Sequence, residues 1–224
     1  MNLNVLYEDN HIIVVEKPVN IPSQGDKTGD EDMLTIIKKY IKEKYKKPGE
    51  VYLGLVHRLD RPTGGVMVFA KTSKAASRLS EQVREKQMKK KYLCIVDGKM
   101  PQEKGTFKDY LLKNERTNTS KVVSKEIKNA KEAILDYEVL KYNEDINLSV
   151  IKVYLHTGRH HQIRLQFSSR KHSLYGDQKY GTRGRGKQLA LWAYSLSFIH
   201  PTKKELMEFE CFPEKTGSWK ILDD

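Results

Sequence analysis

The chain has 224 residues, of which 38% are hydrophobic, so it can bury a substantial core as one large domain or two small ones. No segment approaches the apolar length of a membrane span, and the first ten residues lack the basic and apolar regions of a secretion signal, so we expect a soluble, cytoplasmic protein. The 41 Lys and Arg residues outnumber the 29 Asp and Glu residues, and the resulting formal charge of +12 favours a polyanionic partner such as RNA or DNA.

Hydrophobic patterns along the chain predict more strands than helices. Apolar or alternating runs bounded by turn residues predict strands at 5–7, 11–16, 66–71, 91–96, 132–140, 147–155, 189–199 and 205–212. Helical spacing predicts one helix from Met33 to the Pro48–Gly49 pair and a second one capped by Thr72 or Ser73. The polar and basic segment 113–130 is predicted to be a mobile loop. These elements indicate the α+β class, with a single domain over 1–224 on a mixed, mainly antiparallel sheet with flanking helices.

The segment "YLHTGRHHQIRLQF", residues 154–167, predicts a third, short helix. Thr157 can cap it, and its first turn then carries Arg159, His160 and His161, so that backbone N–H groups and cationic side chains point the same way. This arrangement is typical of an anion-binding site, but an ordinary capped amphipathic helix fits the same residues. The His cluster lacks a neighbouring acidic or Cys ligand, so no metal site is expected.

The stretch "HRLDRPTGG", residues 57–65, places two Arg residues and Asp60 in a loop and continues into the apolar run Val66–Phe69. An Arg and an Asp two positions apart often form an ordinary surface pair. The alternative is a carboxylate that a turn presents to a substrate, with Pro62, Gly64 and Gly65 allowing the turn and the strand anchoring it.

Seven segments in chain order carry a resemblance to a known family: "VVEKP" (14–18), "HRLDRPTGG" (57–65), "AKT" (70–72), "KKYLCIVDG" (90–98), "TGRHHQIR" (157–164), "YGDQKYG" (175–181) and "LALWAYSLSFIHP" (189–201). Together they resemble the RluA family of pseudouridine synthases from about Val14 to Pro213. The family pattern has Ser where Gly64 stands, Thr at His160, Ala at Cys94, Pro at Ser173 and His at Trp192. Those departures bear on substrate identity rather than on activity.

The resemblance implies that Asp60 is the essential carboxylate, that Tyr92 lies against the target base and that Arg164 pairs with Asp60. It also implies contacts to RNA or substrate from His57, Arg58, Arg159, His161 and Gln162. Isomerising uridine is redox-neutral, so no cofactor is expected. The small N-terminal RNA-binding domain that many relatives carry is not expected, and we expect a monomer.

Two other functions remain open. One is a catalytically silent RNA-binding module that keeps the basic surface without using Asp60. The other is a retaining N-glycoside hydrolase, which needs a second carboxylate for which no candidate is apparent. An isomerase acting on tRNA or rRNA is the interpretation that the sequence favours.

Overall fold

The computed structural model describes residues 3–182 and 185–223, and the chain separates into two compact units. The first unit comprises Met1–Lys89 and Ala193–Phe212, and the second comprises Lys90–Trp192 and Pro213–Asp224. We describe each unit by itself, and the single domain expected from the sequence stays a prediction. None of the helices in the described part of the chain combines the length and apolarity needed to cross a bilayer.

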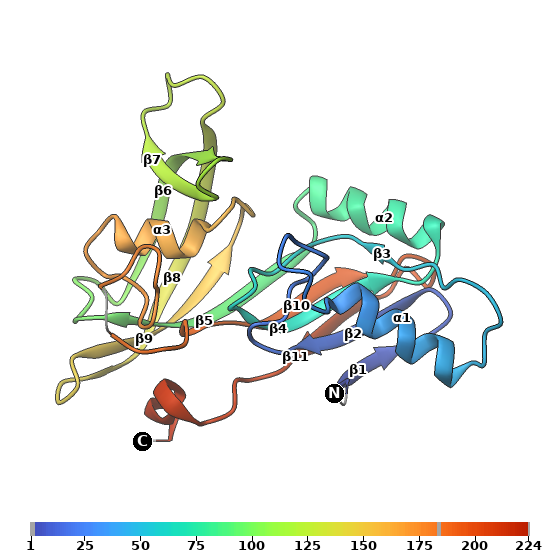
Figure 1. Cartoon of the computed structure of the whole chain (residues 1–224). Coiled ribbons are helices and arrows are strands. Elements are labelled where there is room, and N and C mark those ends of the chain that lie inside the picture. Colours follow the sequence, from blue (N-terminus) through green and yellow to red (C-terminus); the bar gives the residue numbers. More distant parts are fainter. Residues whose placement is uncertain (1–2, 183–184, 224) are drawn as a thin grey trace. The chain divides into compact units, whose positions relative to one another are not determined.

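The first unit is a sheet with two helices (Figure 1). Its elements are β1 (Val5–Glu8), β2 (Ile12–Lys17), α1 (Met33–Lys44), β3 (Gly54–Leu55), β4 (Gly64–Ala70), α2 (Ser73–Arg84), most of β10 (Leu191–Ile199) and β11 (Leu206–Glu210). Hydrogen bonds give the strand order β1-β2-β4-β10, with β11 beside β10 and β3 beside β4. The predicted strands and both predicted helices of this unit are confirmed, and Thr72 caps α2 by accepting from the N–H of Ala75.

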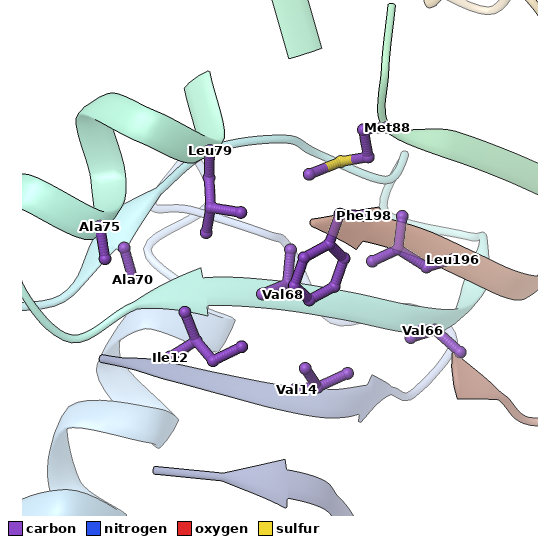
Figure 2. Close-up of a cluster of buried hydrophobic side chains, with 10 residues drawn as sticks. All are labelled: Ile12, Val14, Val66, Val68, Ala70, Ala75, Leu79, Met88, Leu196 and Phe198. Atoms are coloured by element: carbon purple, nitrogen blue, oxygen red, sulfur yellow. The ribbon is translucent and has the colours of Figure 1, made fainter. Parts of the chain in front are cut away.

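Apolar side chains of one sheet face form the core of the first unit together with α2 (Figure 2). The cluster consists of Ile12, Val14, Val66, Val68, Ala70, Ala75, Leu79, Met88, Leu196 and Phe198. Because strand side chains alternate, Ile13, Val15 and Lys17 of β2 lie on the opposite face. β4 is buried along its whole length, which explains why its sequence is continuously apolar.

The second unit is a five-stranded antiparallel arrangement in the order β5-β9-β8-β6-β7. Its elements are β5 (Lys89–Asp97), β6 (Lys104–Asn114), β7 (Thr119–Val123), β8 (Lys131–Asn143), β9 (Leu148–Leu155), helix α3 (Gln162–Ser168) and a terminal 3-10 helix (Gly217–Leu222). Phe167 of α3 packs on Phe107 of β6 and Tyr137 of β8, with ring centroids 5.0 and 5.9 Å apart, so α3 covers that face of the sheet (Figure 1).

The prediction of a mobile loop over 113–130 is wrong for 113–114 and 119–123, which are strand, whereas 115–118 and 124–130 form turns and loop. β6 and β7 form a hairpin in this region, which extends beyond α3 in Figure 1. The side chain of Asn114 accepts hydrogen bonds from the N–H groups of Arg116 and Thr117, and Asn118 adopts a left-handed conformation with φ of 49°. These turn residues close the hairpin, and the polar composition of β7 follows from its exposed position at the end of the strand order.

Gly65 is required where β4 passes β10. Its φ is +124°, and a Cβ atom built on it would lie 2.1 Å from the carbonyl oxygen of Ala193. The backbone of β4 therefore approaches β10 more closely than any residue with a side chain would allow. The neighbouring turn that carries Asp60 is fixed at its C-terminal end by this contact.

We expect Gly65→Ala to lower the free energy of unfolding by about 2–5 kcal/mol, because it adds backbone strain to a collision with the backbone of Ala193. Gly29 has φ of +75° but open space around it, and Gly49 has open space without a positive φ. Gly29→Ala should therefore cost only about 1–2 kcal/mol, and Gly49→Ala should change stability by less than about 0.5 kcal/mol. Denaturant unfolding measures all three, and equal losses would contradict the close approach.

Candidate functional site

The loop between β3 and β4, residues 56–63, carries three of the predicted site residues and is called the Asp60 loop below. Its side chains alternate: His57 and Leu59 are buried, Arg58 is exposed and Asp60 is partly exposed. His57 accepts a hydrogen bond at Nε2 from the N–H of Val68, 3.1 Å away. The imidazole therefore connects the loop to β4. Arg58 and Asp60, which alternate with the buried residues, remain accessible to solvent.

Three further hydrogen bonds fix the loop backbone next to Asp60. The hydroxyl of Ser23 donates to the carbonyl of Leu59 over 2.8 Å and accepts from its N–H over 3.1 Å. The N–H of Thr63 donates to the carbonyl of Asp60 over 2.9 Å, which closes a tight turn. The position of the Asp60 carboxylate is thus set by the backbone on both sides of it.

Lys17 lies beneath this turn, and its side chain is fully buried. Its ammonium group donates to the carbonyls of Pro18, Arg61 and Thr63 over 2.9, 3.1 and 2.8 Å. Burial lowers the pKa of Lys17 to about 7, while the charge of Asp60 acts in the opposite direction and Arg61 adds to the lowering. These bonds join the end of β2 to two loop positions that follow Asp60, so Lys17 holds the loop backbone on the C-terminal side of the carboxylate.

Sequence reasoning gave Lys17 no role, although a signal was present. Lys17 ends the apolar run of β2 at a position whose alternation with Ile13 and Val15 predicts a buried side chain. A Lys at such a position needs internal acceptors, since a buried ammonium group without them is very costly.

Arg61 connects the Asp60 loop to the segment before α1. Its guanidinium group donates to the carbonyl of Asn20 over 3.1 Å, to the hydroxyl of Thr28 over 3.1 Å and to the carboxylate of Asp30. The Arg61 side chain is about 40% exposed, so this pair adds little stability on its own. Its bonds do direct Arg61 toward the segment that contains Asp30.

In the second unit, Arg164 and Asp177 form a buried ion pair. Nε and Nη2 of Arg164 donate to the two carboxylate oxygens of Asp177, each over 2.7 Å, and the two side chains are 6% and 0% exposed. Burial alone would raise the pKa of Asp177, but Arg164 and the N–H groups of Lys179 and Tyr180 hold it below its usual value. The guanidinium carbon also lies 5.3 Å from the ring centroid of Tyr180. The predicted pairing of Arg164 with Asp60 stays a prediction.

The prediction that Thr157 caps an anion-binding helix is wrong. α3 begins at Gln162, and its N-cap is His161, which has φ of 54° and makes no side-chain capping bond. The Thr157 hydroxyl accepts from the N–H of Ile134 in β8 and donates to the side-chain oxygen of Gln162, which also accepts from the N–H of Arg159. Because Gln162 and β8 take up these groups, residues 157–161 form a loop ahead of the helix.

The other residues of this loop that were predicted to contact RNA are hydrogen-bonded to neighbouring groups. Arg159 donates to the carbonyl of Glu132 over 2.8 Å. His161 is buried, its Nδ1 lies 2.8 Å from the Tyr180 hydroxyl, and its ring stacks on His160 at 3.7 Å. Burial, followed by the charge of Arg164, lowers the pKa of His161 to about 2. Its ring is therefore uncharged at neutral pH and cannot attract phosphate through charge.

Tyr92 lies on β5, on the sheet face that α3 covers. It is 7% exposed and pairs directly with Val153 of β9, which in turn pairs with Tyr137 of β8. Directly paired residues project to the same face, and the Tyr137 ring packs on Phe167 of α3. Tyr92 thus shares a sheet face with the helix that carries Arg164. Within the described part of the chain, no group of three His, Cys, Asp or Glu side chains could hold a metal ion.

We expect the pKa of Lys17 to make stability depend on pH. The folded chain binds fewer protons than the unfolded chain between pH 7 and 10.5, so the contribution of Lys17 is present above this range and is lost as the pH falls to 7. The unfolding free energy of the protein minus that of Lys17→Met should rise with pH, approaching about 1.4 kcal/mol per pH unit. Denaturant titrations at several pH values measure this difference, and a flat difference would contradict the depressed pKa.

A family model described as RNA pseudouridylate synthase matches residues 11–169, which include the Asp60 loop, Tyr92 and Arg164. A protein of Aquifex aeolicus, named an uncharacterized RNA pseudouridine synthase, is 37% identical and aligns over 93% of this chain and 68% of its own length. The tRNA pseudouridine synthase C of Haemophilus influenzae is 32% identical over 91% of this chain and 90% of its own.

A solved structure supports the fold. The human RNA pseudouridylate synthase domain containing 4 superimposes with a TM-score of 0.79 at 23% identity, and the match covers 94% of this chain and 89% of that one. The predicted α+β fold on a mainly antiparallel sheet is therefore confirmed. The chain belongs to the family of RNA pseudouridine synthases, as its resemblance to the RluA proteins indicates, and is an RNA-modifying isomerase.

Proposed function

We propose that this synthase isomerises specific uridines of tRNA or rRNA, with Asp60 as its essential carboxylate. The observation that carries the proposal is the Asp60 loop, where Lys17, Ser23 and His57 hold the backbone while the Asp60 carboxylate stays partly exposed. A preorganised carboxylate supported by neighbouring hydrogen bonds is what catalysis at a single acid requires.

The reaction breaks the bond between N1 and C1′, turns the uracil and joins C5 to C1′, after which C5 loses its proton. A carboxylate can attack the sugar or the base, stabilise a sugar-centred cation, or assist a glycal route, and all of these use an ionised Asp60. Lys17 supports this chemistry by holding the loop backbone next to Asp60. The uridine has to leave its stack to reach the carboxylate, and Tyr92 provides an aromatic surface for it.

We assign Arg164 the role of cationic partner of Asp60. Arg58 would occupy the space that the flipped nucleotide leaves. The edge of the substrate would be contacted by Arg159, His161 and Gln162. Arg58 is exposed and has the reach for this role. Arg159, His161 and Gln162 are held in one loop by β8 and Tyr180, so they would act as a rigid surface with little freedom to adapt. His57 is buried, and its support of the loop backbone is the role that its geometry favours.

Two observations bear on the class of RNA. The charge of +12 suits either RNA, and the relative from Haemophilus influenzae is named for tRNA. We place the protein in the cytoplasm as a monomer, where both RNAs are available. Mapping pseudouridines in tRNA and rRNA from cells with and without the gene tests the proposal directly, because the target position should lose its modification in the deletion strain.

Asp60→Asn should abolish pseudouridine formation and leave RNA affinity within about threefold, because the side-chain shape is kept and only the charge is lost. Product analysis and a filter-binding titration on the mapped RNA measure the two quantities. Appreciable turnover by the variant, verified by mass spectrometry to be free of deamidation, would remove Asp60 from the mechanism.

An RNA that carries 5-fluorouridine at the target separates the open functions. A synthase should attack it and stall at a rearranged or enzyme-linked species, since fluorine occupies the carbon that must lose its proton. A silent RNA-binding module would return the RNA unchanged, and a hydrolase would leave an abasic site and free fluorouracil. The stalled species should be absent with Asp60→Asn.

RNA affinity should weaken steeply with salt, because phosphate contacts supply much of it. Among Lys89, Lys90 and Lys91, only Lys90 shares the sheet face of Tyr92. Burial lowers the pKa of Lys90 to about 8, which a neighbouring phosphate would reverse. Neutralising all three should therefore reduce the slope of log affinity against log salt by the amount expected for about one phosphate contact. Lys90→Gln alone should reproduce most of this change. An unchanged slope in the triple variant would show that these lysines face solvent.

A further inference from the structure

The ion pair of Arg164 extends the proposed site to a residue to which we have so far given no role. Asp177 lies in the segment "YGDQKYG", residues 175–181, and takes up Nε and Nη2 of Arg164 with both of its carboxylate oxygens. This side-on fork fixes the plane of the guanidinium group. The remaining N–H bonds, on Nη1 and on the outer side of Nη2, point away from Asp177.

Asp177 is itself held rigidly. Its Oδ1 accepts from the N–H groups of Lys179 and Tyr180 over 2.9 and 3.0 Å. Gly176 has φ of +74°, and a Cβ atom there would lie 2.0 Å from the carbonyl oxygen of Gln188, while one at Gly181 would lie 2.6 Å from the carbonyl oxygen of Asp177. The turn around Asp177 therefore closes only with glycine at these two places.

The same segment is attached to the strand that carries Tyr92. The N–H of Tyr175 donates to the carbonyl of Ile95 in β5 over 2.9 Å. Asp177, Arg164 and β5 thus form one rigid part of the second unit, in which the position of the guanidinium group is set relative to Tyr92.

Charge provides the second argument. A buried guanidinium group without a counter-ion is unstable, and removing one partner of such a pair is strongly destabilising. Asp177 supplies the missing charge, so that the pair is close to neutral and Arg164 influences other carboxylates mainly through the direction of its remaining N–H bonds. An Arg164 without Asp177 would attract nearby anions more strongly and in a less defined geometry.

We propose that Asp177 is a positioning residue for the isomerisation, which acts through Arg164 by fixing the plane of its guanidinium group and by offsetting most of its charge. The inference rests on the proposed function, in which Arg164 serves Asp60. It predicts that Asp177 and Arg164 behave as one functional unit in turnover.

A double-mutant cycle tests this coupling. Asp177→Asn should lower kcat at least tenfold and change KM for the mapped RNA by less than about threefold. Arg164→Met should lower kcat by a similar or larger factor, and the double variant should be no slower than Arg164→Met alone. Losses that multiply in the double variant, or an Asp177→Asn variant with the kcat of the wild type, would overturn the inference.

The pH profile distinguishes positioning from a purely structural role. In Asp177→Asn the charge of Arg164 is no longer offset, so the acid limb of kcat, which reports ionisation of the essential carboxylate, should move to lower pH. Asp177→Glu keeps the charge but displaces the two hydrogen bonds to Arg164. In this variant kcat should fall, whereas the pH of the acid limb should stay as in the wild type. A limb that stays in place in Asp177→Asn would contradict the charge argument.

A matched control is available in the same unit. Asp109 of β6 also forms a fork with an arginine, Arg170, over 2.9 and 3.1 Å. Asp109→Asn should lower thermal stability without moving the acid limb. If Asp177→Asn does not fold, two other variants still test the positioning role. One is the double variant with Arg164→Met, which buries no unpaired charge, and the other is Asp177→Glu. Wild-type enzyme assayed alongside separates the two claims, since absence of product there refutes the proposed function itself.

Discussion

The buried ammonium group of Lys17 is the interaction on which the geometry of the Asp60 loop depends. This one group donates hydrogen bonds to the carbonyls of Pro18, Arg61 and Thr63, which come from two segments far apart in the sequence. Each of these buried carbonyls needs a hydrogen-bond donor, and Lys17 supplies one to all three. The charge of Asp60 in turn opposes the lowering of the Lys17 pKa by burial, so the two groups are electrostatically linked.

The second unit uses a comparable principle with the charges reversed. There the buried carboxylate of Asp177 accepts hydrogen bonds from the guanidinium group of Arg164 and from two backbone N–H groups. In each unit the group proposed to face the substrate is held by an oppositely charged or polar group that is more deeply buried. Neither supporting residue is recognisable from the chemistry of the reaction, because neither has to contact the uridine.

Much of the fold could be predicted because its strands carry strong local signals. The alternation in β11 and the largely apolar runs of β4 and β10 give strands in the sequence and in the structure alike. Thr72 could be recognised as a cap because its partner, Ala75, lies three residues away. Thr157 misled for the opposite reason, since its partner Ile134 lies in β8, and a contact over 23 residues leaves no local pattern. The long-range contacts of Lys17 and Asp177 escaped prediction for the same reason, although the motif around Asp60 was located from sequence.

The β6–β7 hairpin shows how a polar composition can serve a folded strand. Among the described residues β7 is the last strand in its order, so no further strand pairs with its outer side within the second unit. An apolar strand in that place would offer a template for pairing with another copy of the chain. β7 is only five residues long, and Lys121 stands exposed in its centre, with Lys125 and Lys128 shortly after it. The N–H of Ser120 in β7 also donates to the Tyr180 hydroxyl over 2.7 Å, so the exposed lysine and this contact both disfavour pairing of the edge with another copy.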